Sequence, residues 1–205
     1  MTRTALPLVL ASSSPRRMEL LGRLGLELLV VAPNVAETPL PHEEPPTHAL
    51  RVAREKALAV SVLHPDFPVL AADTVVVLGD RIFGKPASRG EAASMLADLA
   101  GRTHTVLTGL AVRWGETEAT HLERASVTLV PYREDLFGWY VATGEVDDKA
   151  GAYAVQGKGA ILVERIEGNV QAVMGLPLAV LPALFAMVGL ELAVDGDRLQ
   201  VNRRA

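Results

Sequence analysis

The chain alternates between short apolar runs and segments whose hydrophobic positions repeat with helical spacing. Apolar or alternating stretches of strand length predict β-strands at residues 6–11, 26–32, 69–78, 103–113, 119–130 and 160–166. Helical spacing, with capping or proline signals at several starts, occurs at residues 16–25, 47–63, 88–99, 133–143 and 178–188. This order predicts an α/β protein with a mixed sheet flanked by helices, as one large domain or as two lobes with a cleft between them.

Several stretches depart from this pattern. Residues 33–46 contain five prolines and three glutamates, which predicts a loop. Residues 195–205 are polar, and we expect them to fray. The uncharged run 172–190 is interrupted by glycines and prolines, so a buried turn and a short helix explain it better than a membrane span. An apolar start at residues 1–13 imitates a signal peptide, but its apolar region is of minimum length and contains a proline.

Composition narrows the classes of function. The 205 residues carry a net charge of -4, so nothing favours a nucleic-acid partner. With 49% hydrophobic and 21% charged residues the chain is not disordered. The absence of cysteine excludes disulfides and thiolate metal sites, and it fits a reducing cytoplasm. The cations are 16 arginines and only 4 lysines, so a lysine here can mark a position that needs a compact ammonium group.

The first candidate site is the junction between the first predicted strand and helix. Ser12 and the two serines after it precede Pro15, Arg16 and Arg17. The start of a helix attracts anions, and paired guanidinium groups add bidentate donors for phosphate oxygens. A capped helix with two exposed arginines is the alternative, and this segment alone does not choose between them.

Two charged residues stand where apolar ones are expected. Lys56 lies on the inward stripe of its predicted helix, where it must snorkel, pair with an acid or face a ligand. Asp73 interrupts an apolar strand, where an unpaired carboxylate would cost several kcal/mol. Asp73 must therefore be paired, bind a metal or sit at the open end of the strand, and buried acids of this kind are candidate general bases or metal ligands.

The remaining lysines lie in glycine-containing segments. Lys85 follows Gly84 in a predicted tight turn, which lacks the spacing of a P-loop. Glycines flank Gln156 and Lys158, so the backbone can approach a ligand, and a glutamine amide can read a base edge. All four lysines fall in candidate segments, which favours a phosphate-handling site.

Seven segments follow one another along the chain: Leu10-Ala-Ser-Ser-Ser-Pro-Arg-Arg, Glu55-Lys-Ala, Ala72-Asp-Thr-Val, Gly84-Lys-Pro, Asp148-Lys-Ala-Gly-Ala-Tyr, Gln156-Gly-Lys-Gly and Gly175-Leu-Pro-Leu. In this order they resemble the Maf family of nucleoside triphosphate pyrophosphatases. The resemblance covers about residues 6–190. It implies one Maf-like domain over residues 1–205, with two lobes, a substrate cleft and a fold similar to the inosine triphosphatase type, the Maf/Ham1 fold.

The resemblance also implies roles for individual residues. Asp73 matches the catalytic general base, and Glu37 with Asp73 matches the site of a divalent metal cation, Mg²⁺ or Mn²⁺. The matching phosphate contacts are Ser12, Arg17, Lys56 and Lys85. Lys158 lies in the matching substrate loop. The positions that select the base in the dTTP/UTP branch are Arg16, Thr74 and Gln156.

The expected reaction is hydrolysis of dTTP and UTP, or of modified pyrimidine triphosphates, to the monophosphate and pyrophosphate. The alternatives are a pyrophosphatase for 7-methyl-GTP or purine nucleotides, and a non-catalytic regulator of cell division. We expect a cytoplasmic protein whose partner is the nucleotide, without nucleic acid or membrane, and a homodimer stays open.

Overall fold

A computed structural model describes residues 5–204, so the first four residues of the targeting-like start and Ala205 lie outside the described part. The strands are β1 (Leu8–Ala11), β2 (Leu28–Val31), β3 (Val69–Leu78), β4 (Arg81–Phe83), β5 (Thr103–Trp114), β6 (Thr117–Leu129), β7 (Val163–Gly168), β8 (Leu190–Asp195) and β9 (Arg198–Arg203). The α-helices are α1 (Pro15–Gly22), α2 (Pro45–Ser61), α3 (Arg89–Leu99), α4 (Glu134–Ala142), α5 (Val170–Val173) and α6 (Leu181–Met187). Short 3₁₀ helices are η1 (Ala150–Ala152), η2 (Gly157–Leu162) and η3 (Leu178–Val180).

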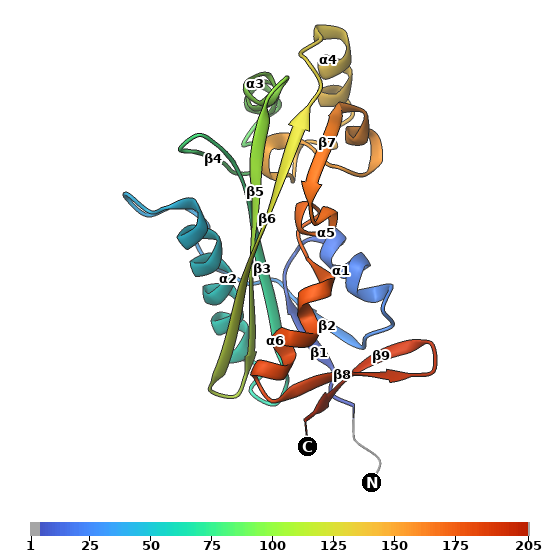
Figure 1. Ribbon diagram of the computed structural model, residues 1–205. Coiled ribbons are helices and arrows are strands. Elements are labelled where there is room, and N and C mark those ends of the chain that lie inside the picture. The colour runs from blue at the N-terminus through green and yellow to red at the C-terminus, as the bar shows by residue number, and fades with distance from the viewer. Residues whose placement is uncertain (1–4, 205) are drawn as a thin grey trace. The chain divides into compact units, whose positions relative to one another are not determined.

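The central sheet is mixed, as predicted. Its hydrogen-bonded order is β2-β1-β3-β5-β6-β7, and β4 pairs with β3 (Figure 1). β1 runs parallel to β2 and β3, whereas β4 and β7 are antiparallel to β3 and β6. The parallel part contains a β-α-β unit, and the antiparallel part contains hairpins, which matches the change in pattern along the sequence.

The chain divides into two compact units. The first contains Met1–Asp73, Thr108–Leu122 and Gly175–Ala205, and the second contains Thr74–Leu107 and Glu123–Met174. The long strands β3, β5 and β6 contribute residues to both units. The cleft expected between two lobes stays a prediction.

In the first unit, α2 packs on the sheet through small side chains. Ala53 and Ala57 of α2 meet Val9, Ala11 and Ala71 of the strands in one buried cluster. In Figure 1, α1 and α2 lie on opposite sides of these strands. Small residues on the inward stripe let the helix lie close to the sheet, so Lys56 on the same stripe is carried into the interior.

α2 and β5 approach each other closely at a glycine. A Cβ atom added to Gly109 would lie 2.4 Å from the carbonyl oxygen of Ala49 in α2. Only glycine permits this approach, because any side chain would push the helix outward. The depth at which Lys56 sits is therefore fixed by backbone contact as well as by the apolar stripe.

The second unit has its own core of larger side chains, which includes Phe83, Phe137, Tyr140 and Leu96. α3 begins as the sequence predicted, because Ser88 accepts a hydrogen bond from the Glu91 N–H. The cap therefore fixes the start of α3, and the core holds its inward face through Leu96.

The prediction of a frayed end is wrong. Residues 190–203 form a hairpin of β8 and β9, and Val201 is buried. The Leu6 N–H donates to the Val201 carbonyl, and the Leu199 N–H donates to the Leu24 carbonyl. The sequence does contain a signal for this hairpin, a Gly196-Asp197 turn between two short alternating stretches. In the structure Gly196 has a φ of +62°.

Other boundaries also shift. The proline-rich loop ends at Glu44, because Pro45 and Pro46 open α2. Residues 84–86 are irregular and do not form the predicted tight turn, and the three-residue strand β4 before them was not predicted. The strand predicted at 160–166 begins only at Val163, after η2. Within residues 5–204, no helix is both long and apolar enough to cross a membrane.

Candidate active site

A buried lysine joins two carboxylates in the first unit. The Lys56 ammonium lies 2.7 Å from Oδ1 of Asp73 and 2.7 Å from Oε1 of Glu37. The side chains of Lys56 and Asp73 are only 5% and 9% exposed, whereas that of Glu37 is 43% exposed. The structure therefore brings together three of the predicted site residues, and Lys56 pairs with acids instead of snorkelling.

Each member of this cluster comes from a different local structure. α2 carries Lys56 inward, β3 places Asp73 where the first unit's part of the strand ends, and the loop before α2 brings Glu37 to the ammonium from the solvent side. The paired positive charge offsets the cost of burying the carboxylate of Asp73. A carboxylate can accept a proton or bind a cation, so both functional interpretations of Asp73 are compatible with its surroundings.

The two carboxylates also suit a hard divalent cation. Mg²⁺ is commonly bound through one or two carboxylates, with substrate phosphates and water completing its coordination. In the described part of the chain, no three acidic or histidine side chains converge as a complete metal site. Glu37 and Asp73 fit a cation that is shared with a bound polyphosphate.

A second group of predicted residues lies at the start of α1. Ser12 is buried, and its hydroxyl oxygen accepts from the Ser14 N–H at 3.1 Å and from the Arg17 guanidinium at 3.3 Å. Nε of Arg17 donates to the carbonyl of Gly175 at 2.9 Å. Pro15 occupies the first turn of the helix, as the sequence predicted. Arg16, one residue earlier on the same turn, is half-buried, whereas Arg17 is buried.

Arg17 is therefore a buried cation, so the alternative of a capped helix with two exposed arginines does not hold for this residue. Burial lowers the pKa of Arg17, and the negative charge of Asp73 acts in the opposite direction. Arg16 lowers the pKa further and Glu37 raises it, so both acids of the Lys56 cluster stabilise the guanidinium. The helix start thus carries a positive charge electrostatically linked to the acid–lysine cluster.

The loop with Gln156 and Lys158 is organised by an acid that the sequence did not single out. The Glu145 carboxylate accepts from the N–H of Lys158 at 3.0 Å and from that of Gly159 at 3.1 Å. A Cβ atom added to Gly159 would lie 2.4 Å from the Ala154 carbonyl oxygen. The glycines are thus required for packing inside this unit, and the loop has a defined shape before any ligand binds.

The remaining predicted residues also lie in the second unit. Thr74 follows Asp73 directly in β3 and is half-buried, and Lys85 is exposed. Gln156 is half-buried, and Lys158 is exposed. The approach of these side chains to the Asp73 cluster stays a prediction.

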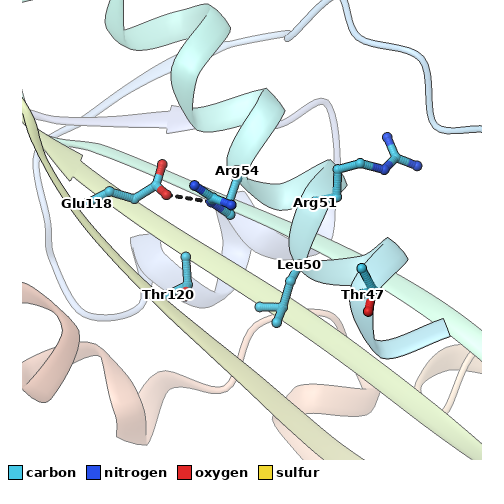
Figure 2. A pocket seen from close by; sticks show the side chains of 6 residues that line it. All are labelled: Thr47, Leu50, Arg51, Arg54, Glu118 and Thr120. Carbon is cyan, nitrogen blue, oxygen red and sulfur yellow. Dashed lines mark hydrogen bonds and ion pairs between the residues drawn. The ribbon is translucent and has the colours of Figure 1, made fainter. Parts of the chain in front are cut away.

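A pocket of about 380 Å³ in the first unit contains none of the predicted site residues (Figure 2). Its lining residues are Thr47, Leu50, Arg51, Arg54, Glu118 and Thr120. Nε of Arg54 pairs with Glu118 at 2.5 Å, and Arg51 pairs with Glu43 and Glu55. Its arginines are already matched by acids, so the pocket is a poor site for a phosphate.

The mixed sheet, the buried acid–lysine cluster and the cationic helix start define an α/β protein with a candidate site for a polyanion. The chain belongs to the family of Maf-like proteins, whose family model matches residues 7–188. The resemblance found in the sequence is therefore confirmed.

Named relatives are similar over most of the chain. A dTTP/UTP pyrophosphatase of Myxococcus xanthus is 48% identical over 90% of this chain and 94% of its own. A dTTP/UTP pyrophosphatase of Symbiobacterium thermophilum is 47% identical over 83% of this chain and 88% of its own. Among solved structures, the Staphylococcus aureus Ham1 protein is similar with a TM-score of 0.46 and 14% identity, over 82% of this chain and 96% of that one.

Proposed function

We propose that this protein hydrolyses dTTP and UTP to the nucleoside monophosphate and pyrophosphate. The observation that carries the proposal is the placement of Lys56 at 2.7 Å from both Asp73 and Glu37, inside a chain of the Maf-like family. The names of the relatives support this choice of reaction and nucleotide.

In the proposed reaction, Asp73 accepts a proton from water through the carboxylate oxygen that does not face Lys56. The oxygen of that water attacks the α-phosphorus, the bond from the α-phosphorus to the bridging oxygen breaks, and its electron pair leaves with pyrophosphate. Lys56 holds the Asp73 carboxylate in place until the proton is transferred. Both products retain their phosphate charges, which the cations of the site must offset.

Phosphate binding is assigned to Ser12, Arg17, Lys56 and Lys85. A guanidinium that is fixed by Gly175 loses little conformational freedom when it meets an oxygen. Glu37 and Asp73 would hold Mg²⁺ or Mn²⁺. When bound, such a cation neutralises the negative charge that develops between the α- and β-phosphates.

Base selection is assigned to Arg16, Thr74 and Gln156, with Lys158 in the same loop as Gln156. Uracil and thymine present an O4 acceptor beside an N3–H donor, and one glutamine amide can bind both. Cytosine reverses this order and would leave buried groups unpaired, at a cost of about 1–3 kcal/mol. The hydrogen bonds of Glu145 to the loop support a fixed orientation of Gln156.

The test is release of pyrophosphate from a panel of triphosphates with Mg²⁺ or Mn²⁺. We expect the highest kcat/KM for dTTP and UTP, lower values for CTP, ATP, GTP, ITP and 7-methyl-GTP, and pyrophosphate rather than orthophosphate as the primary product. An optimum on 7-methyl-GTP or ITP would overturn the choice of base. Nucleotide binding without turnover would instead favour a regulator.

We further infer a cytoplasmic location, since the substrate is a cellular nucleotide and the chain has no cysteine. The purified protein can also be tested for the formation of a homodimer. Sedimentation at several protein concentrations distinguishes a monomer from a dimer, and turnover measured over the same range shows whether association matters for activity.

A further inference from the structure

The loop that carries Glu37 is fastened to α2 by a second buried acid. The side chain of Glu43 is only 6% exposed. Its carboxylate accepts from Nε of Arg51 at 2.6 Å, from Nη2 of Arg51 at 2.8 Å and from the Leu40 N–H at 2.9 Å. Nδ1 of the buried His48 lies 3.1 Å away. The hydrogen bond from Arg51 is the main reason that the pKa of Glu43 falls to about 2.

The same guanidinium reaches the residue beside Glu37. Nη2 of Arg51 donates to the carbonyl oxygen of Thr38 at 3.2 Å. The Arg51 side chain therefore binds the loop at two points: the backbone of Thr38, through a hydrogen bond, and the carboxylate of Glu43, through a bidentate ion pair. Between these points the loop also closes on itself through Leu40 and Glu43.

The contacts that Arg51 makes with the loop lie on a different side of α2 from Lys56, the residue that pairs with Glu37. Arg51 and Lys56 are five residues apart on the helix, so they point about 140° away from each other. The loop must therefore pass around part of the helix to bring Glu37 to Lys56. Because Glu37 is 43% exposed and Thr38 follows it directly, the hold on Thr38 limits where the carboxylate can move.

We propose that Glu43 and Arg51 are positioning residues that hold Glu37 at Lys56 and so set the affinity of the site for its divalent cation. The inference rests on the proposed function, since it assigns Glu37 to the cation. Groups that orient a metal ligand typically change metal affinity by about 10–100-fold when they are removed. A purely structural ion pair would change stability and leave metal affinity unaltered.

The experiment compares Glu43→Gln with Glu44→Gln, a change at the neighbouring glutamate, which precedes α2 and makes no side-chain cap. Arg51→Lys is a second variant, which keeps the positive charge but cannot form the bidentate contact that a guanidinium makes. Mn²⁺ binding is followed by electron paramagnetic resonance with the α,β-methylene analogue of UTP, which the enzyme cannot cleave. The Mn²⁺ concentration for half-maximal turnover of UTP is measured in parallel.

We expect Glu43→Gln and Arg51→Lys to weaken Mn²⁺ binding about tenfold and to raise the activating concentration by the same factor. Turnover at saturating Mn²⁺ should change by less than about threefold, and Glu44→Gln should match the parent protein. Folded variants with unchanged Mn²⁺ affinity would overturn the inference. If the parent protein neither binds Mn²⁺ with the analogue nor releases pyrophosphate, the proposed function itself fails.

Discussion

Replacing Lys56 by methionine tests how far the buried ammonium offsets the cost of burying the Asp73 carboxylate. Lys56→Met keeps most of the length of the side chain and removes the charge that lies 2.7 Å from Asp73 and from Glu37. Removing one partner of a buried pair costs about 3–5 kcal/mol. We expect the lower end, about 3 kcal/mol, because Glu37 can turn to water and the positive charge of Arg17 still acts on Asp73.

The partner variant and the double variant make this figure testable. Asp73→Asn leaves the ammonium paired with Glu37, so it should lose only about 1–2 kcal/mol, the value of one charged hydrogen bond. In the double variant an apolar chain faces a neutral amide, so its total loss should be close to 2 kcal/mol. The two single losses then exceed the double loss by about 2–3 kcal/mol, as expected for residues in direct contact.

Urea unfolding of the four proteins gives these free energies, provided that the slopes of the transitions agree. If the two single losses add up to the double loss within about 0.5 kcal/mol, the Lys56 charge does not offset that of Asp73. Turnover of UTP adds an independent readout. Asp73→Asn should be slower on the order of 10²-fold while still binding nucleotide, and near-normal turnover would refute its role as a base.

Two further predictions concern the second unit. Burial lowers the pKa of His104 from 6.5 to about 4. As the pH falls, the unfolded chain therefore binds a proton at this residue before the folded protein does. Acidification from pH 7 to pH 5 should lower the free energy of unfolding by about 2 kcal/mol. His104→Gln should flatten that slope in urea titrations, and parallel curves for the two proteins would contradict this. Gly159→Ala would place a Cβ atom 2.4 Å from the Ala154 carbonyl oxygen, so it should lower the free energy of unfolding by about 1–3 kcal/mol and weaken the preference for UTP over CTP. The control is Gly138→Ala in α4, where an added Cβ atom would have nothing within 4 Å and should be neutral or stabilising. An alanine at 159 that leaves both stability and preference unchanged would show that the loop does not need its glycine.

The elements that could be predicted from the sequence are those with a strong local signal. The apolar run of β3 has the predicted bounds, Val69–Leu78, and Ser88 caps α3 as expected. The C-terminal hairpin was missed because its strands alternate weakly and its burial comes from contacts with Leu6 and Leu24, far away in the sequence.

The candidate site could be predicted in part for a related reason. Lys56 and Asp73 are charged residues in apolar patterns, so they stand out in the sequence itself. Glu43 and Glu145 lie among other polar residues, and nothing local distinguishes them from solvated acids. Their importance depends on which N–H groups they accept from, those of Leu40 and Arg51 for Glu43 and those of Lys158 and Gly159 for Glu145, and the local pattern of polar residues does not reveal these contacts.

The bond from Arg17 to Gly175 has a consequence for how the protein is made. The two residues are 158 positions apart, so at about 5–20 residues per second the ribosome adds the carbonyl roughly 8–30 s after the guanidinium that binds it. The hairpin that holds Leu6 and Leu24 is made later still. Throughout this interval the helix start that carries Ser12 and Arg17 lacks these contacts, so the first unit cannot be completed before β9 has left the ribosome.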